Sequence, residues 1–123
     1  MPVRRDTRDP RDLLPLTPVV LHMLMALADG EKHGYAIAQT VEQDTDGHIR
    51  MGPGTLYGSI QRMLHAGLIA ESLRAARPDD DERRRYYRTT VLGRRVLALE
   101  LERLSDVVRV AAAKGLLQER SAR

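Results

Sequence analysis

The sequence contains no cysteine, no phenylalanine and no tryptophan, and aromatic residues make up only 3% of it. Without cysteine, neither a disulfide framework nor a thiolate metal site is possible. Because large aromatic rings are almost absent, the core depends on Leu, Val, Ile, Met and Ala, which favours packed helices. The chain has 123 residues, enough for one modest core. We therefore expect one domain, mainly α, that completes its core by dimerising.

Long apolar runs and catalytic motifs are also lacking. No segment reaches the length of about 18 apolar residues that a membrane helix needs, and the first residues are charged. The four histidines show no metal-ligand spacing, and neither a phosphate-binding glycine loop nor a nucleophile motif occurs. The sequence thus predicts a cytoplasmic protein that is not an enzyme, with no membrane contact, no metal and no cofactor.

The charge balance leans towards the basic side. The chain carries 20 Lys and Arg residues against 17 Asp and Glu residues, for a formal net charge of +3. Only Lys32 and Lys114 are lysines, and arginine is the residue that best matches phosphate groups and guanine. A balance of this size fits a polyanionic partner without requiring one.

Residues 52–69 are the most informative stretch, because signals for both ends of a helix are visible in them. Gly52 and Gly54 supply backbone freedom, Pro53 fixes the φ angle before the helix, and Thr55 is a candidate cap. Gly67 suits the left-handed position that ends a helix. We expect a turn, a helix of about three turns and the start of a strand.

The helix expected after Thr55 has two faces of different chemistry. Apolar residues at positions 56, 60, 63 and 64 share one face. The opposite face carries Gly58, Gln61, Arg62 and His65 and has no carboxylate, so nothing on it repels a polyanion. A recognition helix in the DNA major groove needs such a face. An ordinary core helix with a weakly charged exterior has the same pattern, and this helix alone leaves both interpretations open.

The polar positions of this helix fit distinct roles in DNA binding. Hydroxyl groups near the helix start can hydrogen-bond to phosphates, whereas Gln61 and Arg62 can pair with base edges and Gly58 permits close approach. For Tyr57, a second interpretation is a ring packed against the preceding helix with its hydroxyl at the surface. The predicted DNA-binding residues of this helix are Thr55, Tyr57, Gly58, Ser59, Gln61 and Arg62.

Two helices are expected before this stretch and two strands after it. Thr17-Pro18 is a cap followed by a proline, and it opens a helix to about residue 28 that is apolar on nearly every side. Residues 33–44 form the second helix, with Tyr35 among its largely inward residues. Residues 68–74 and 84–90 read as the two strands of a hairpin. Three helices followed by a small β-hairpin is the order of a winged helix-turn-helix.

The hairpin loop, residues 75–83, is polar and contains four acidic residues. Three arginines follow its acidic tip, and because side chains alternate along a strand, they cannot all face DNA. Those on the DNA side are expected to contact phosphates. The alternative is a solvated charge run that neutralises the carboxylates of the loop. The predicted DNA-binding residues of the wing are Arg83, Arg84 and Arg85.

From residue 91 the chain is expected to form one long helix to about residue 117, with Thr90 as its cap. Its apolar residues make two adjacent stripes, of which one can pack on the domain and the other on a partner. A helix of about 25 residues protrudes from so small a domain, and protruding apolar surface implies association. The predicted dimerisation residues are Leu97, Leu101, Leu104, Val108 and Ala111.

The first residues alternate arginine with aspartate and include two prolines. Such a composition predicts a flexible, solvated N-terminal arm over residues 1–16. A basic arm that reaches into a DNA minor groove is the alternative, which the aspartates weaken.

Five short motifs follow one another between roughly residues 17 and 110. They are Leu24-Met25-Ala26-Leu27, His33-Gly34-Tyr35-Ala36-Ile37, Gly52-Pro53-Gly54-Thr55-Leu56-Tyr57, Gly67-Leu68-Ile69, and Arg85-Tyr86-Tyr87-Arg88-Thr89-Thr90 with Gly93. Each is weak alone, but five in series are specific. In this order and spacing the chain resembles the PadR family of bacterial transcriptional regulators.

The resemblance implies a winged helix-turn-helix DNA-binding domain at residues 17–90 and a C-terminal dimerisation helix and tail at residues 91–123, as in the short-tailed branch of the family. It implies a homodimer. Because a two-fold dimer carries one recognition helix per subunit, we expect it to bind a pseudo-palindromic operator in double-stranded DNA, with half-sites about 10 bp, or a multiple of that, apart. Such a dimer usually represses nearby genes until a small-molecule or stress signal relieves it; the effector here is unknown.

The chain departs from the family pattern at three points. Gly58 stands where relatives often carry proline or a larger residue, and the tip of the wing is acidic. The lack of tryptophan means that ligand binding between interface tryptophans does not carry over. A winged-helix module that binds proteins, without specific DNA binding, is the alternative function.

Overall fold

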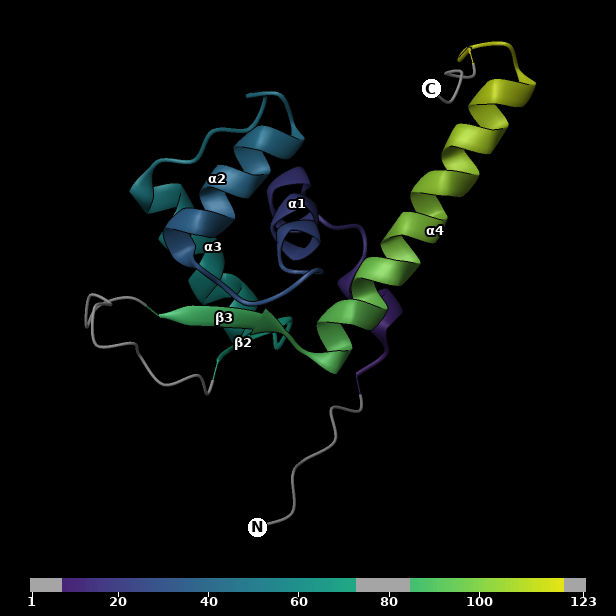
Figure 1. Cartoon of the computed structure of the whole chain (residues 1–123). Coiled ribbons are helices and arrows are strands. Elements are labelled where there is room, and N and C mark those ends of the chain that lie inside the picture. The colour runs from purple at the N-terminus through teal and green to yellow at the C-terminus, as the bar shows by residue number, and fades with distance from the viewer. Residues whose placement is uncertain (1–7, 73–84, 119–123) are drawn as a thin grey trace.

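The computed structural model describes residues 8–72 and 85–118. The elements in chain order are a 3-10 helix η1 (Pro10–Leu13), α1 (Pro18–Ala26), β1 (Lys32–His33), α2 (Gly34–Asp44), α3 (Pro53–His65), β2 (Ile69–Glu71), β3 (Tyr86–Thr89) and α4 (Val91–Ala113). The first three α-helices pack beside a small antiparallel sheet, and α4 starts at the end of β3 and leaves the domain (Figure 1). The predicted fold class, mainly α with a small β-element, is confirmed.

Local capping signals start the first two α-helices where the sequence predicts. The side chain of Thr17 accepts a hydrogen bond from the Val20 N–H (3.2 Å), and Pro18 occupies the first turn. His33 caps α2 by accepting from the Ala36 N–H (3.2 Å). The three helices enclose an aliphatic core, whose most buried members include Met23, Leu24, Leu27, Ile37, Val41, Ile60 and Met63.

The sheet has three strands in the order β1-β3-β2. β2 and β3 form the predicted antiparallel pair, in which Ile69 lies opposite Thr89. β1 was not predicted; it pairs antiparallel with the other edge of β3 and places His33 opposite Tyr86. Two residues are too few to show an alternating pattern, so only the pairing with β3 identifies them as a strand.

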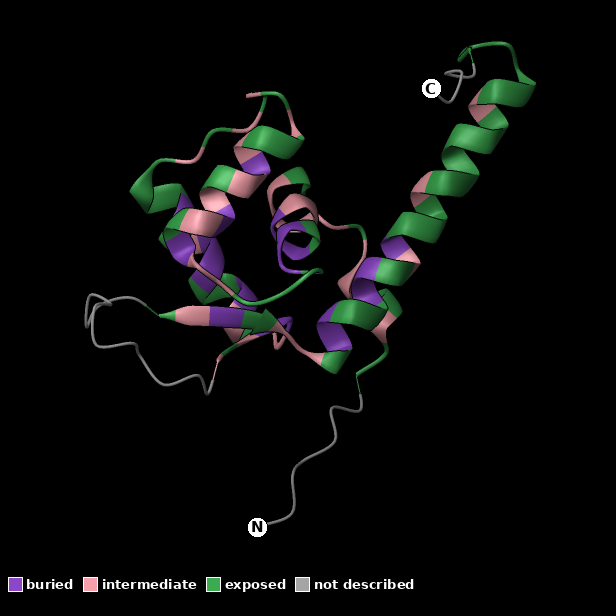
Figure 2. Cartoon of the chain, in the orientation of Figure 1, coloured by how far each residue is buried: buried purple, intermediate pink, exposed green. Residues whose placement is uncertain are grey.

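The start of α4 is locked to the domain. Thr90 caps the helix by accepting from the Gly93 N–H (3.0 Å), as predicted. A Cβ atom on Gly93 would lie 2.0 Å from the Leu68 carbonyl oxygen, so only glycine allows the helix to pack so closely on the strand. Beyond Glu100, no residue of α4 is buried (Figure 2). The second half of the helix therefore stands free of its own domain.

The segment before α1 does not match the expectation of a flexible arm over residues 1–16. Its residues from Pro10 to Leu13 form η1, which packs against α4. Leu13, Leu14 and Leu16 are partly buried against the core. These apolar side chains, rather than the surrounding charges, decide the placement, because burying them removes apolar surface from water. Residues 1–7 lie outside the described part of the chain.

Two further side chains lie differently from their predicted positions. Tyr35 was expected to turn inward but is 63% exposed, whereas Ile37 and Val41 of the same helix are the ones that face the core. Leu97, expected in a dimer contact, is only 7% exposed and belongs to the core of its own chain. Its own domain already covers it, so little of Leu97 is left exposed for the predicted dimer contact.

Candidate nucleic-acid interface

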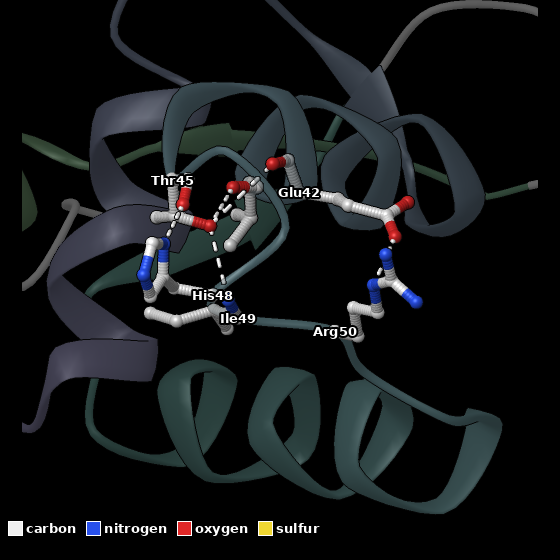
Figure 3. A network of polar contacts seen from close by, with 6 residues as sticks. Glu42, Thr45, His48, Ile49 and Arg50 are labelled. Atoms are coloured by element: carbon white, nitrogen blue, oxygen red, sulfur yellow. Dashed lines mark hydrogen bonds and ion pairs between the residues drawn. The ribbon is translucent and has the colours of Figure 1, made fainter.

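The turn between α2 and α3 is held by a polar network (Figure 3). The Thr45 Oγ1 accepts from the Ile49 N–H at 3.1 Å. His48 Nδ1 lies 2.7 Å from the Thr45 carbonyl oxygen, and Arg50 Nε lies 2.9 Å from Glu42 Oε1. The network ties the turn to the end of α2, and it thereby helps to fix the position of α3 relative to α2.

The first turn of α3 begins earlier than predicted. Gly52 is the N-cap residue, no side chain caps the helix, and Pro53 occupies its first position. Thr55 therefore lies inside the helix and is exposed, so its predicted role as the cap is wrong. The two glycines and the proline already set the backbone for the helix start, and no threonine hydroxyl is needed there.

The exposed face of α3 has the predicted composition. Gln61, Arg62 and His65 are exposed, and Gly58 is partly exposed between them. The helix contains no acidic residue from Pro53 to His65. Leu56, Ile60 and Met63 on the other face are buried in the core. The face is therefore polar or positive along its whole length.

Ser59 does not belong to this face. Its side chain is 1% exposed, and its Oγ accepts a hydrogen bond from Arg62 Nη2 at 3.2 Å. Ser59 therefore has almost no exposed surface for the predicted DNA contact, because it lies three positions after Leu56 and one turn before Met63 on the buried side. Its bond places the Arg62 guanidinium beside Gly58, where an added Cβ would lie 3.5 Å from Arg62 Nη1.

Tyr57 lies against the start of α2 and is still 52% exposed. A Cβ atom on Gly34 would lie 3.2 Å from Tyr57 Cε1 and 3.5 Å from its hydroxyl oxygen, so the ring packs on that glycine. This contact is the second interpretation of Tyr57 that the sequence left open. The exposed half of the ring still belongs to the same surface as the polar face of α3.

Tyr35 extends this surface onto α2. Its ring stacks parallel to the ring of His33, with the centroids 6.5 Å apart. Between α2 and the start of α3 lies a cavity of about 330 Å³, whose lining includes Tyr35, Gln39, Arg50, Met51, Pro53 and Tyr57. Sequence reasoning missed Tyr35 as a surface residue; its position two residues after the capping histidine, outside the apolar spacing of Ile37 and Val41, was the available signal.

The wing contributes basic side chains on its described strand. Arg85 is exposed and its Nη1 lies 3.2 Å from Glu71 Oε1 on the neighbouring strand. Arg88 is exposed next to Tyr87, and burial of Tyr87 raises the pKa of its hydroxyl. The predicted contacts Arg83 and Arg84, like the loop of residues 75–83, lie outside the described residues.

A second surface, of opposite chemistry, lies on the free half of α4. Val107, Val108 and Val110 are each about half exposed, and Leu101 is 39% exposed. Leu104 and Ala111 are partly buried on the same helix. We call this set the α4 apolar face: Leu101, Leu104, Val107, Val108, Val110 and Ala111.

Two features are missing from residues 8–72 and 85–118. Within these ranges no three His, Cys, Asp or Glu side chains come together as they would around a metal ion. Within the same ranges no helix has the length and apolar character needed to cross a membrane.

Comparison with known proteins identifies relatives that match most of the chain. Residues 23–99 match the family described as "Transcriptional regulator PadR-like family". The chain is 36% identical over 91 residues to the transcriptional regulator Rv3488 of Mycobacterium tuberculosis, covering 74% of this chain and 79% of that protein. It is 39% identical over 79 residues to an uncharacterized 37.1 kDa protein in transposon TN4556 of Streptomyces fradiae. That match covers 63% of this chain but only 20% of the larger relative.

A solved structure shares the fold. A PadR family transcription regulator from Clostridium difficile superposes with a TM-score of 0.64 at 20% identity, covering 79% of this chain and 97% of that one. At this identity the likeness concerns the fold alone. The match extends over nearly all of that protein and over most of this chain.

Proposed function

Because this chain belongs to the PadR-like family of transcriptional regulators, whose members are regulators and not enzymes, we propose that it is a homodimeric repressor of nearby genes that acts in the cytoplasm. It binds a pseudo-palindromic operator in double-stranded DNA, and a small-molecule or stress signal releases it. The family supports the DNA partner in general terms; the dimer, the repression and the release are parts of the proposal.

The observation that carries the proposal is the exposed face of α3. A surface helix without any carboxylate over Pro53 to His65 presents no charge that repels phosphates. The buried residues of the helix fix its rotation, so the outward face is set by the core. The rotation of a recognition helix about its own axis decides which of its side chains enter a major groove.

Within this face, Gln61 and Arg62 are the proposed base readers. Both are exposed on α3, and both side chains can form paired hydrogen bonds with a base edge, glutamine with adenine and arginine with guanine. Arg62 is held by its bond to Ser59 when DNA is absent. It must exchange that bond for a base contact, whereas Gln61 has no such bond among the contacts described. Gln61 is therefore the first candidate.

Phosphate contacts are proposed around the base readers. Thr55 and Tyr57 are exposed near the start of α3, and Tyr35 adds a third hydroxyl across the cavity. On the wing, Arg88 forms no ion pair with another described residue, whereas Arg85 would first have to leave Glu71. Contacts of this type position a protein on the duplex without reading its sequence.

The α4 apolar face supports the proposed homodimer. Each copy would cover the same face of the other about a two-fold axis, as in most dimers of soluble proteins. Two recognition helices would then meet two half-sites about 10 bp apart, or a multiple of that distance. The symmetry of the operator follows from the symmetry of the dimer.

A salt titration tests the proposal. The full chain is mixed with a duplex from its own promoter region, and the affinity is measured by gel shift between about 50 and 200 mM salt. DNA binding through several phosphates should weaken by roughly 10³-fold or more over this range. Competition by random DNA gives the specificity. Weak, salt-insensitive binding without discrimination would instead support a protein-interaction module.

A further inference from the structure

Glu100 is a buried carboxylate at the point where α4 leaves the domain. Its side chain is 1% exposed, although the residues that follow it on the helix are exposed or only partly buried. It is the last buried residue of α4. A charged group in this position needs partners, because burying an unpaired carboxylate is very unfavourable.

Two donors hold the Glu100 carboxylate, one on each oxygen. The backbone N–H of Leu16 donates to Oε2 at 2.7 Å, and Arg103 Nε donates to Oε1 at 2.5 Å. Arg103 is on the same helix, whereas Leu16 precedes Glu100 by 84 residues. One carboxylate thus joins the segment before α1 to α4.

The segment that Glu100 holds is residues 8–16, which we call the strap. At one end, Leu16 is tied to α4 through Glu100, and η1 packs on the same helix. At the other end, Arg8 donates a hydrogen bond to the carbonyl of Ala66, the residue that ends α3. The strap therefore runs from the C-terminal end of α3 to the point where α4 leaves the domain.

An apolar residue at position 100 would avoid the desolvation cost of a buried carboxylate. Replacing buried ion pairs by apolar side chains of similar volume is often neutral or stabilising. What a carboxylate adds is direction: Arg103 on the same helix holds one oxygen, and the other oxygen meets the Leu16 N–H only in one orientation of α4 relative to the strap. The geometry is thus better explained by placement of α4 than by stability.

We propose that Glu100 is a positioning residue that fixes the angle between α4 and the winged-helix domain. Through this angle it sets the spacing at which the two recognition helices of the dimer meet DNA, a consequence that rests on the proposed function. The helix continues for 13 residues from Glu100 to Ala113, about 20 Å at 1.5 Å per residue. A rotation of about 10° would move its end by about 3.5 Å, close to the rise of one base pair.

The angle can be measured without DNA by spin-label distances. The chain lacks cysteine, so Gln39→Cys on α2 and Arg109→Cys on α4 give two unique labels at exposed positions. The labelled chain is diluted into an excess of unlabelled chain, so that only distances within one copy are recorded. Glu100→Leu and Arg103→Gln are compared with the parent, and Glu102→Gln, an exposed neighbour, is the matched control.

The parent and Glu102→Gln should give one narrow distance distribution. In Glu100→Leu the distribution should broaden or shift by about 2 Å or more, as expected for a rotation near 10° at this distance along the helix. Arg103→Gln removes only a half-exposed donor, so it decides the matter if Glu100→Leu fails to fold. Glu100→Gln keeps an oxygen for the Leu16 N–H and should restore most of the narrow distribution.

The DNA consequence is tested with synthetic duplexes. They carry two copies of the half-site that the parent selects from a random-sequence library, at spacings changed by one and two base pairs. The parent should lose about tenfold or more in affinity per changed spacing, as expected when the second site is no longer engaged. Glu100→Leu should lose about threefold or less, with its affinity for a single half-site unchanged.

The two tests separate the two ideas. If Glu100→Leu and Arg103→Gln keep the distance distribution of the parent, Glu100 does not position α4 and the inference is overturned. If the distances change as expected but the parent selects no DNA, the proposed function fails while the role of Glu100 at the base of α4 stands.

Discussion

α3 and α4 are both amphipathic helices that leave one face uncovered, yet the two uncovered faces have opposite chemistry. The face of α3 carries Gln61, Arg62 and His65 and no carboxylate. That of α4 carries Val107, Val108 and other aliphatic residues. A polar face without negative charge suits a polyanion, whereas an aliphatic face suits another apolar surface. We therefore propose DNA as the partner of the α3 face and a second copy of the chain as the partner of the α4 apolar face.

The largest expected effect comes from placing a carboxylate on the α4 apolar face. Val108→Asp would bury a charge in the proposed dimer contact, which costs several kcal/mol. We expect a monomer in light scattering and a loss of about 100-fold or more in affinity for a two-site duplex. Arg109→Asp, which puts the same charge on the polar side of α4, should remain a dimer. If Val108→Asp also remains a dimer, the contact lies elsewhere.

The corresponding change on α3 should act on DNA alone. Gln61→Glu places a carboxylate on the face that lacks one, and we expect affinity for every duplex to fall by about 10- to 100-fold through repulsion by phosphates. The oligomeric state should not change. Fluorescence anisotropy with labelled duplexes measures the affinity. His65→Glu, nearer the end of the helix, is the control and should lose less. Equal losses would move the contact surface towards the C-terminal end of α3.

A smaller effect is expected at the wing. Arg88→Ala should weaken binding to operator and random DNA by similar factors and reduce the slope of log affinity against log salt by about one. Arg85→Ala serves for comparison, because Arg85 is already paired with Glu71 in the free protein. An unchanged slope in both variants would exclude the described strand of the wing from phosphate contact.

The smallest effect concerns the base of α4. The hydrogen bond from Arg103 holds the pKa of Glu100 below its ordinary value, although burial acts in the opposite direction. The ionised form therefore contributes stability above the ordinary glutamate pKa, and this contribution disappears as the pH falls through the lowered pKa. Urea unfolding of the parent should show this acid loss, and Glu100→Gln should show less of it. Identical pH profiles would mean that the charge of Glu100 does not affect folding.

Much of the fold follows from local signals in the sequence. The caps Thr17 and Thr90 act within their own helices, so their roles could be predicted from neighbouring residues. Gly67, with a φ of +79°, occupies the predicted left-handed position after α3. β1 could not be predicted, because two residues become a strand only through their pairing with β3.

The candidate sites were predicted less completely, since burial depends on packing between distant segments. Gln61 and Arg62 are exposed as expected, but Ser59 is buried, and the 3.6-residue period around Leu56 and Met63 could have shown this. Nothing in the sequence singled out Glu100. Arg103 is a neighbour on the same helix, but the other partner, the backbone of Leu16, is 84 residues away and could not be seen in any local pattern.

The central claim is that the exposed face of α3 reads the DNA sequence. The most direct measurement compares the parent with the Gln61→Ala, Arg62→Ala double variant, using the duplex that the parent selects and a random duplex of equal length at one salt concentration. The account predicts that the ratio of the two affinities falls by about 10- to 100-fold, from losses of about 1–3 kcal/mol per base contact, while random binding changes little. An unchanged ratio would contradict the claim.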